Sequence, residues 1–432
     1  MPNLALLGGK PVNPKGHVRW PQINQRDRDF IMRALDEGII WGTSAPQVLA
    51  FEKEWGEYVG TKHCLSCNSG TAALHMAVAA ADVKPGDEVI TASLTFVASA
   101  MCALQHNAIP VFVDVDPRTF CMDVSKLEAK ITKKTKAIIP VDLHGMSCDY
   151  DEINKIAHKY GIVVIADACQ SHGAFYKGRK VGTLTDMSVF SLNGLKNLQA
   201  GDGGLFNTDD DYFVAKANQL RVFGEIVESP RNYNSIGMGW MYRMLELPAA
   251  YARSRLVTLD EENSVRQQNG KYLTKLLSDL PGLIPPYIPE DRTTVYHYYR
   301  IRLNPEALGL KIDKNEFRAR IQNALAAEGV ANQRWQTRPV QEQGLFTEKI
   351  GYGHGCPWTC KYAGSDPVVY DPEDYRVTKE ILADSFCLYD GIYPPNGTEL
   401  MDLYSEAFHK VWDNMDEVLA YKLDPSDRLL KD

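Results

Sequence analysis

Short apolar runs recur through the first half of the chain, and segments with helical spacing of apolar residues separate most of them. Because the runs show no alternation of apolar and polar positions, they predict strands buried on both faces, as in a parallel sheet. These strands are expected at 62–66, 87–91, 109–114, 136–141, 162–166, 187–192 and 204–207. Helices are expected between them at 71–82, 95–106, 124–131 and 149–159, after two N-terminal helices at 26–38 and 46–59. The alternation predicts an α/β fold in which helices sandwich a mostly parallel, mixed sheet.

The pattern changes in the second half of the chain. Runs 187–192 and 204–207 have no helix between them and predict a hairpin within the sheet, followed by helices at 209–223 and 243–272. Four prolines between 281 and 289 then mark a boundary. Beyond them we expect a β-rich stretch (294–303), a helix (313–328), a Trp/Tyr/Pro-rich loop region (334–375) and an amphipathic helix (399–420). We predict a large α/β domain over 1–275, which includes the N-terminal helical segment, and a smaller C-terminal α+β domain over 276–432.

Composition narrows the class of protein. With 432 residues, of which 44% are hydrophobic and 24% charged, the chain can bury a large core. Its net charge of −8, without a long basic run, argues against nucleic-acid and anionic-membrane partners. The N-terminal apolar run is too short for a signal peptide, and no stretch reaches the roughly 18 apolar residues of a membrane-spanning helix. The nine cysteines are scattered among apolar neighbours, so we predict a cytoplasmic protein with reduced thiols.

Two cysteine pairs, Cys64 with Cys67 and Cys356 with Cys360, have spacings that occur in the halves of zinc sites. Cys67, however, adjoins a glycine turn that is better explained as the start of an anion-binding helix. No metal is therefore expected.

Two residues carry the candidate chemistry. Asp167 ends the run 162–166, at the carboxyl edge of the sheet, where folds of this kind bind ligands. Lys196 lies in a Gly-flanked turn just after the run 187–192. An enzyme that uses pyridoxal 5′-phosphate (PLP) needs this pair, because the lysine forms a Schiff base and the carboxylate keeps the pyridine nitrogen protonated. Taken alone, Lys196 could be a solvated surface residue, and Asp167 a helix cap or half of an ion pair.

Other residues at strand ends would complete a cofactor site. The segment 68–74 opens a helix, so its N–H groups and the Ser69 and Thr71 hydroxyls can bind an anion, although a plain helix cap is the alternative. Phe96 begins the next predicted helix and can stack on a flat ring, unless it belongs to the core. Gln170 can contact the phenolic oxygen of the cofactor, and Ser191 can complete the phosphate site. An anion site, a ring stacker, a carboxylate and a lysine thus converge on one edge of the sheet.

A series of motifs runs along the chain in this order: LALLGGKPV, NSGTAALHMAV, PGDEVITASLTFVASA, PVFVDVDPRTF, ADACQSHGA, FSLNGLKNLQAGDGG and YRMLELPAA. This series, which covers nearly the whole chain, resembles the DegT-type sugar aminotransferases, a branch of the fold-type-I PLP enzymes. The resemblance implies that Lys196 carries PLP as a Schiff base and that Asp167 pairs with the pyridinium nitrogen. It further implies that Gln170 contacts the ring oxygen, that Phe96 stacks on the ring, and that the phosphate is bound by Ser69, Gly70, Thr71 and Ser191.

The resemblance also implies an activity. Glutamate or glutamine would donate an amino group, the cofactor would pass through pyridoxamine 5′-phosphate, and a keto-sugar or keto-cyclitol would accept the group. Such reactions belong to amino-sugar, aminocyclitol or antibiotic biosynthesis. The family is dimeric, with active sites shared between subunits, so a homodimer is expected. The motifs DACQSHG, GCPWTC and PVQEQGLF are similar to members that aminate keto-cyclitols such as inososes, or related keto-sugars.

Two positions depart from the family pattern. Met241 stands directly before YRM, where the family commonly has an Asn that reaches the partner subunit's phosphate, and Asn232, Asn234 or a water are the candidates to replace it. The three residues before the lysine, 193–195, differ from the usual aromatic/His-x-Thr pattern. The substrate pocket beside the lysine is therefore expected to be unusual.

Four further residues are candidates for substrate contacts. His172 can contact substrate hydroxyls or be a structural histidine, and Arg243 is expected near the dimer seam. Arg334 and Arg338 can bind the donor carboxylate, since a fork of donors suits that group, with a solvated loop as the alternative.

Three other functions fit parts of the sequence. Related sugar dehydratases use PLP but have a histidine in place of the Schiff-base lysine, which Lys196 disfavours. A non-catalytic, PLP-binding regulatory protein of the same fold would differ in lacking turnover. A nucleotide-binding Rossmann enzyme would need G-x-G-x-x-G after the first strand, and NSGTAAL does not match it.

Overall fold

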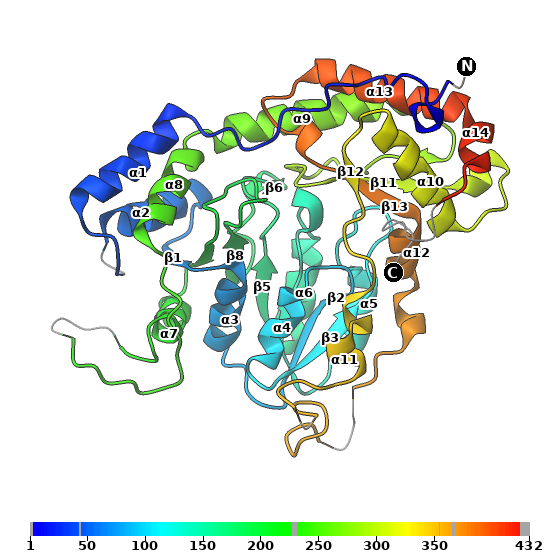
Figure 1. Ribbon diagram of the computed structural model, residues 1–432. Helices are drawn as coiled ribbons and strands as arrows, with labels where there is room; N and C mark the ends of the chain where they lie inside the picture. Colours follow the sequence, from blue (N-terminus) through cyan, green and yellow to red (C-terminus); the bar gives the residue numbers. More distant parts are fainter. Residues whose placement is uncertain (1–2, 43–44, 227–230, 354, 365–367, 424–432) are drawn as a thin grey trace.

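The computed structural model describes residues 3–42, 45–226, 231–353, 355–364 and 368–423 (Figure 1). A seven-stranded sheet lies at its centre, made of β1 (His63–Cys67), β9 (Gly204–Thr208), β8 (Met187–Ser191), β5 (Val163–Asp167), β4 (Thr135–Ile139), β2 (Glu88–Ala92) and β3 (Ile109–Val113), in this order. Strands β8, β5, β4, β2 and β3 run parallel, whereas β9 is antiparallel to both of its neighbours. The predicted mostly parallel sheet and the predicted hairpin of β8 and β9 are therefore confirmed.

Helices cover both faces of this sheet. In β5, Val164 and Ala166 pack on one face and Ile165 on the other, as the period of a strand requires. The face of Ile165 is covered by α3 (Gly70–Ala80), α4 (Ala98–Leu104) and α7 (Asp211–Arg221), and the opposite face by α2 (Pro46–Val59), α6 (Tyr150–Tyr160) and α8 (Glu246–Leu256). Because helices cover both faces, apolar residues predominate on both sides of the strands, which explains the missing alternation in the sequence.

A second, antiparallel sheet lies beside the first in the C-terminal part of the chain (Figure 1). Its order is β10 (Leu283–Ile284), β11 (Tyr299–Leu303), β13 (Ser385–Leu388) and β12 (Asn332–Gln333). Its core also takes in α9 (Leu259–Leu276), α10 (Lys314–Ala327), α13 (Thr398–Asp413) and α14 (Met415–Ala420). Leu4 and Trp20 from the N-terminal segment are buried in this same core. The division of the chain at residue 275 stays a proposal.

The structure differs from the sequence predictions in several elements. The helix predicted at 243–272 is two helices, α8 and α9. Asp260, Glu261 and Glu262 lie in the first turn of α9, where their negative charges interact favourably with the positive end of the helix dipole. Helix α4 begins three residues later than predicted, since the Thr95 hydroxyl bonds the Ser99 hydroxyl (2.8 Å) and holds the preceding turn outside the helix. The short pair β6 (Phe175–Tyr176) and β7 (Arg179–Lys180), together with α12 (Arg376–Asp384), β12 and β13, was not predicted.

The remaining helices are peripheral to the site. They are α1 (Gln25–Glu37), the single turns α5 (Val124–Leu127) and α11 (Gly344–Thr347), and 3-10 turns. The loop region after β12 is anchored where Phe346 and Tyr370 pack on Phe112 of β3, with ring centroids 5.4 and 5.3 Å away. Among the described residues, no helix is long and apolar enough to cross a bilayer. The same residues hold no group of three or more His, Cys, Asp or Glu side chains placed to bind a metal ion.

Candidate active site

A cavity of about 310 Å³ opens where β5 and β8 end, between the large sheet and the C-terminal part of the chain. Its wall includes all eight residues that the sequence predicted for the cofactor: Ser69, Gly70, Thr71, Phe96, Asp167, Gln170, Ser191 and Lys196. These residues come from four separate segments of the chain, and the fold brings the four segments together around one cavity.

Strand periodicity explains why the central groups share one side of the sheet. Asp167 lies two residues after Ile165 in β5, and Ser191 lies two residues after Val189 in β8. Ile165 and Val189 both face α3 and α4. The carboxylate and the hydroxyl therefore point to the same face, where the first turn of α3 lies.

The Asp167 carboxylate is buried and held by two hydrogen bonds. Ser99 of α4 donates from Oγ to Oδ2 (2.7 Å), and the backbone N–H of Cys169 donates to Oδ1 (3.3 Å). The two bonds fix the plane of the carboxylate, while each oxygen keeps a lone pair for a further donor. Sequence reasoning missed Ser99, whose only signal is its place in the helix that follows Phe96.

Lys196 sits in a turn closed by its own backbone. The N–H of Gly194 donates to Gly201 O (2.7 Å), that of Lys196 to Asn193 O (2.8 Å), and that of Ala200 to Leu192 O (2.8 Å). The side chain is half-buried and lines the cavity, so it is not a solvated surface lysine. Burial lowers the pKa of Lys196, although the nearby groups of Cys169 and Asp167 act in the opposite direction. A lowered pKa increases the neutral, nucleophilic fraction of the amine.

The first turn of α3 forms an anion site beside β8. The Ser69 Oγ accepts a bond from the N–H of Ala72 (3.0 Å), so Ser69 does cap the helix, and its hydroxyl proton stays available as a donor. A Cβ atom on Gly70 would lie 2.7 Å from the Ser191 Cβ and 3.2 Å from the Cys169 Sγ. Only glycine lets the helix start this close to the strand. The N–H groups of this first helical turn and the helix dipole favour a bound anion.

Phe96 and Gln170 complete the predicted set. Phe96 lies in the loop before α4 rather than at the start of the helix, and 57% of its surface is exposed. It is therefore not a core residue. The side chain of Gln170 is buried, and its Oε1 accepts a bond from the N–H of His144 (2.8 Å). That bond fixes the amide so that its NH₂ group is left to donate.

The C-terminal part of the chain adds residues that the sequence analysis missed. His297, Tyr298 and Trp335 line the cavity, and the rings of Tyr298 and Trp335 lie 5.9 Å apart. Burial, and next the charge of Lys196, hold the pKa of His297 well below its ordinary value, so this histidine is neutral at physiological pH. His297 and Tyr298 belong to the aromatic run at 296–299, and this run is a sequence signal from which both could have been predicted.

The four predicted substrate residues lie elsewhere. His172 is fully buried, with its ring centroid 5.9 Å from that of Trp55 and 5.3 Å from that of Phe190. Burial, and next Lys196, lower the pKa of His172 to about 3. Arg243 has its guanidinium 5.8 Å from the centre of the Phe223 ring. These two, and also Arg334 and Arg338, are not among the described residues that line the cavity. The last pair lines a separate pocket of about 390 Å³.

Comparison with known proteins identifies the family. The DegT/DnrJ/EryC1/StrS aminotransferase family matches residues 21–365. The chain belongs to this family. It is 39% identical over 292 residues to GDP-perosamine synthase of Caulobacter vibrioides, covering 67% of this chain and 78% of that protein. It is 34% identical over 331 residues to a putative L-glutamine:3-amino-2,3-dideoxy-scyllo-inosose aminotransferase of Streptoalloteichus tenebrarius, covering 76% of this chain and 78% of the relative.

Solved structures agree with this assignment. The crystal structure of 3-amino-5-hydroxybenzoic acid synthase superposes with a TM-score of 0.81 at 26% identity, covering 93% of this chain and 99% of that one. DesV of S. venezuelae, crystallised with a ketimine intermediate, superposes with a TM-score of 0.76 at 26% identity, covering 92% and 95%. The predicted family and fold are confirmed, and the chain is a PLP-dependent aminotransferase.

The residues of the cavity fit this cofactor. The helix start of α3 offers N–H groups for a phosphate, Asp167 offers a carboxylate for a protonated ring nitrogen, and Lys196 offers an amine for the aldehyde. The volume of about 310 Å³ lies within the range of roughly 300–1,000 Å³ that small-molecule sites occupy.

Proposed function

We propose that this aminotransferase moves an amino group from glutamate or glutamine to the ketone of a keto-sugar or keto-cyclitol, in amino-sugar or aminocyclitol biosynthesis. The names of the relatives, which include a perosamine synthase and scyllo-inosose aminotransferases, support this substrate class. The observation that carries the proposal is the single cavity in which the half-buried Lys196, the fixed Asp167 carboxylate and the first turn of α3 meet.

The proposed roles of the residues rest on their positions in the cavity. When bound, the cofactor supplies an electron sink for the carbanion at the amino-acid Cα. Lys196 would hold the cofactor through its aldehyde, and its Nζ would serve as the base that moves the substrate Cα proton. Asp167 would keep a proton on the ring nitrogen. The N–H groups of Gly70 and Thr71 and the hydroxyls of Ser69, Thr71 and Ser191 would hold the phosphate.

Two side chains would orient the ring. Phe96, which lines the cavity and is 57% exposed, would stack on it. Gln170 would donate its NH₂ group to the ring oxygen, since its Oε1 is already bonded to His144. His297, Tyr298 and Trp335 line the same cavity and would contact the substrate.

Amino transfer is tested in two half-reactions with purified, PLP-loaded protein. Glutamate and glutamine, added separately, should each be assayed for conversion of the cofactor to pyridoxamine 5′-phosphate, by absorbance and chromatography. A panel of free keto-cyclitols and nucleotide-linked keto-sugars is then tested for recovery of PLP. Conversion by one donor and recovery by one ketone are expected. A cofactor that neither donor changes would contradict the proposal and would leave a PLP-binding regulatory protein.

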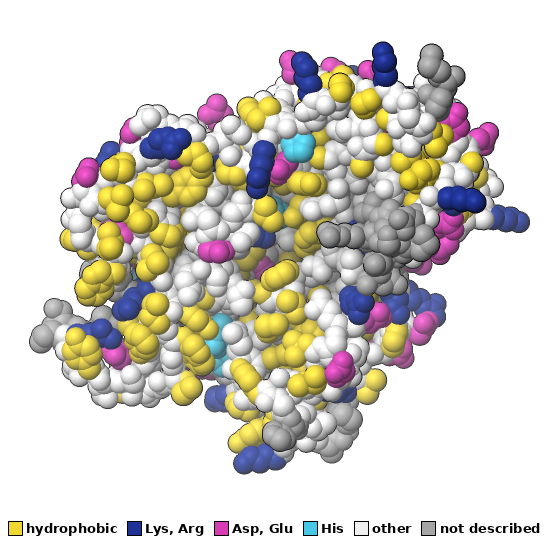
Figure 2. Space-filling model, viewed as in Figure 1, with side chains coloured by type: hydrophobic (Ala, Val, Ile, Leu, Met, Phe, Trp, Pro, Cys, Tyr) yellow, Lys and Arg dark blue, Asp and Glu magenta, His cyan; other side chains and the backbone are white. Residues whose placement is uncertain are grey.

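We also propose a homodimer. Figure 2 shows apolar side chains gathered over α1 and α2, and the exposed ones there are Met32, Leu35, Ile39, Ile40, Trp41 and Leu49. A second exposed set lies in the segment after α7: Phe223, Ile236, Met238, Met241 and Leu245. So much exposed apolar surface is typical of a protein interface. Light scattering should give the mass of a dimer, and Trp41→Asp should weaken it, whereas Leu403→Asp on α13 should not.

A further inference from the structure

Arg300 is a fully buried cation on β11, two residues after Tyr298 of the cavity wall. Within the described part of the chain, no Asp or Glu forms an ion pair with it. Asp384, whose charge acts on it, is held instead by two hydrogen bonds from Arg302 (2.9 and 2.6 Å). A buried charge is costly unless hydrogen bonds satisfy it, so the partners of Arg300 indicate its role.

Three hydrogen bonds hold the Arg300 guanidinium, and they reach three different segments. Nε donates to the Oγ of Ser385 on β13 (2.9 Å), Nη2 to the backbone oxygen of Trp335 (3.2 Å), and Nη1 to the Nε2 of His144 (3.0 Å). Because a guanidinium has donors only, the His144 Nε2 must be the acceptor. His144 is therefore neutral, with its proton on Nδ1. Burial, and next the charge of Arg300, accordingly hold the pKa of His144 well below its ordinary value.

His144 in turn contacts three residues that line the catalytic cavity. Its N–H donates to the Gln170 Oε1 (2.8 Å), and its carbonyl accepts a bond from the N–H of His297 (3.0 Å). Its ring lies edge-on to that of Trp335, with the centroids 5.1 Å apart. The backbone of His144 has a φ of +59°, in the left-handed region that a residue other than glycine keeps only where its surroundings hold it. The bond from Arg300 supplies part of that hold.

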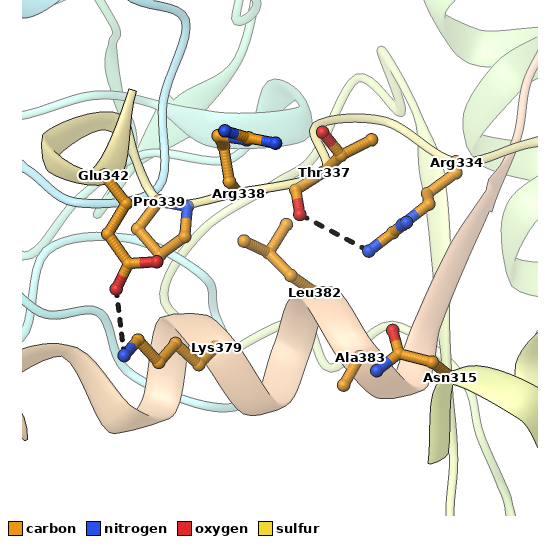
Figure 3. A pocket seen from close by; sticks show the side chains of 9 residues that line it. All are labelled: Asn315, Arg334, Thr337, Arg338, Pro339, Glu342, Lys379, Leu382 and Ala383. Atoms are coloured by element: carbon orange, nitrogen blue, oxygen red, sulfur yellow. Dashed lines mark hydrogen bonds and ion pairs between the residues drawn. The ribbon is translucent and has the colours of Figure 1, made fainter. Parts of the chain in front are cut away.

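Arg300 also fixes the chain at Trp335. The preceding residue, Arg334, lines the separate pocket and donates to Thr337 O (3.3 Å), as Figure 3 shows. Trp335 instead lines the catalytic cavity, and the centre of its ring lies 5.9 Å from the Arg300 guanidinium. The bond from Arg300 to the Trp335 carbonyl therefore holds the segment where it passes from one space to the other.

We propose that Arg300 and His144 are positioning residues: Arg300 locks His144, and His144 holds the Gln170 amide toward the cofactor ring. This inference rests on the proposed function, in which Gln170 donates to the ring oxygen. A donor bond stabilises negative charge on that oxygen, so the oxygen holds less tightly the proton of the neighbouring nitrogen that joins Lys196 to the cofactor. A looser Gln170 amide should therefore raise the pH at which this proton is lost.

The test is a pH titration of the absorbance of the bound cofactor. Arg300→Met has no donors and should raise the midpoint by about 0.5 pH unit, a roughly threefold gain in proton affinity. Gln170→Leu removes the whole bond and should raise the midpoint by about one unit or more. In the double variant, Arg300→Met should add nothing to Gln170→Leu, because both changes act through one bond.

Arg302→Met is the matched control on the same strand. Arg302 bonds Asp384 and the Pro117 carbonyl (3.1 Å), but neither of these partners is among the described residues that line the cavity. The control leaves Asp384 buried and unpaired, so it should lower the melting temperature of the apo-protein and keep the wild-type midpoint. His144→Asn removes the ring without altering Arg300, and asparagine tolerates the positive φ of this position. It should raise the midpoint as Arg300→Met does.

The inference is overturned if Arg300→Met or His144→Asn titrates like the wild type. It is also overturned if Arg302→Met raises the midpoint as far, since loss of stability would then be the cause, or if the two shifts add up in the double variant. None of these results contradicts amino transfer, which the half-reactions test separately. An unchanged midpoint in Gln170→Leu would overturn both this inference and the proposed contact of Gln170 with the ring oxygen.

Discussion

Gly70→Ala tests whether the close approach of α3 to β8 shapes the phosphate site. The new Cβ would lie 2.7 Å from the Ser191 Cβ and 3.2 Å from the Cys169 Sγ. The Ser191 Cβ, and the Ser191 Cα at 3.2 Å, belong to a buried strand, so on this side no flexible side chain can move aside. The first turn of α3 must instead shift away from β8 and widen the phosphate site.

The expected magnitude follows from two terms. Overpacking of a buried site costs about 1–3 kcal/mol of folding free energy. Displacing the helix start lengthens N–H bonds to a charged phosphate, and such bonds contribute about 1.5–3 kcal/mol each. Losing one of them corresponds to a PLP dissociation constant raised about tenfold to a hundredfold. We therefore expect a larger effect on cofactor affinity than on melting temperature.

The assay is titration of the apo-protein with PLP, followed by absorbance of the bound cofactor, together with thermal unfolding of both forms. Gly194→Ala is the matched control in the turn beside the site, because the nearest atom to its added Cβ, Gly201 O, is 3.6 Å away, an ordinary contact. The control should keep both affinity and stability within about 0.5 kcal/mol of the wild type. If Gly70→Ala binds PLP as tightly as the control does, the reasoning about this helix start is refuted.

Three further predictions concern single side chains. Lys196→Ala should abolish both amino transfer and the absorbance band of the PLP imine, and a variant that keeps both would exclude Lys196 as the Schiff-base lysine. Ser99→Ala removes the 2.7 Å hydrogen bond to the Asp167 carboxylate. Because hydrogen bonds to charged groups contribute about 1.5–3 kcal/mol, kcat should fall about tenfold with little change in KM. An unchanged kcat would show that this bond does not position the carboxylate. Burial raises the pKa of Asp142 to about 7, above its value of about 3.9 in an unfolded chain, so its contribution to stability is fully present below pH ~4 and is lost as the pH rises through 7. Denaturant unfolding at pH 5 and at pH 7 should therefore show that the free energy of unfolding of the wild type falls relative to that of Asp142→Asn as the pH rises, by up to about 1.4 kcal/mol per pH unit. The same difference between the two proteins at both pH values would contradict this prediction.

Local pattern was sufficient for most of the large sheet. All seven predicted strands are present within one or two residues of their predicted bounds, because a strand buried on both faces is short and mostly apolar. The pattern was weaker in the C-terminal part, where β12 is two residues long and β13 four. Such strands are stabilised by pairing with residues far away in the chain, which no local window contains.

The site likewise contains residues that the sequence predicted and residues that it did not. Asp167 and Lys196 could be found from the sequence because each follows directly after a buried strand, and the family motifs pointed to the other six cofactor residues. Ser99 and Trp335 could not be found in this way. A serine in a helix and a tryptophan in a loop carry no local signal of a shared cavity.

The sequence alone therefore determined the α/β class, the order of strands and helices along the chain, and the residues expected to hold the cofactor. Each of these depends on the apolar pattern of a short segment or on the residues directly after a strand. Only the tertiary structure decided which residues meet across the chain: His297 and Trp335 in the catalytic cavity, and Arg334 and Arg338 in a separate pocket. The physical reason is that one residue of an extended segment, such as Trp335, faces opposite to its neighbour Arg334. What lies on each side is set by the packing of distant elements.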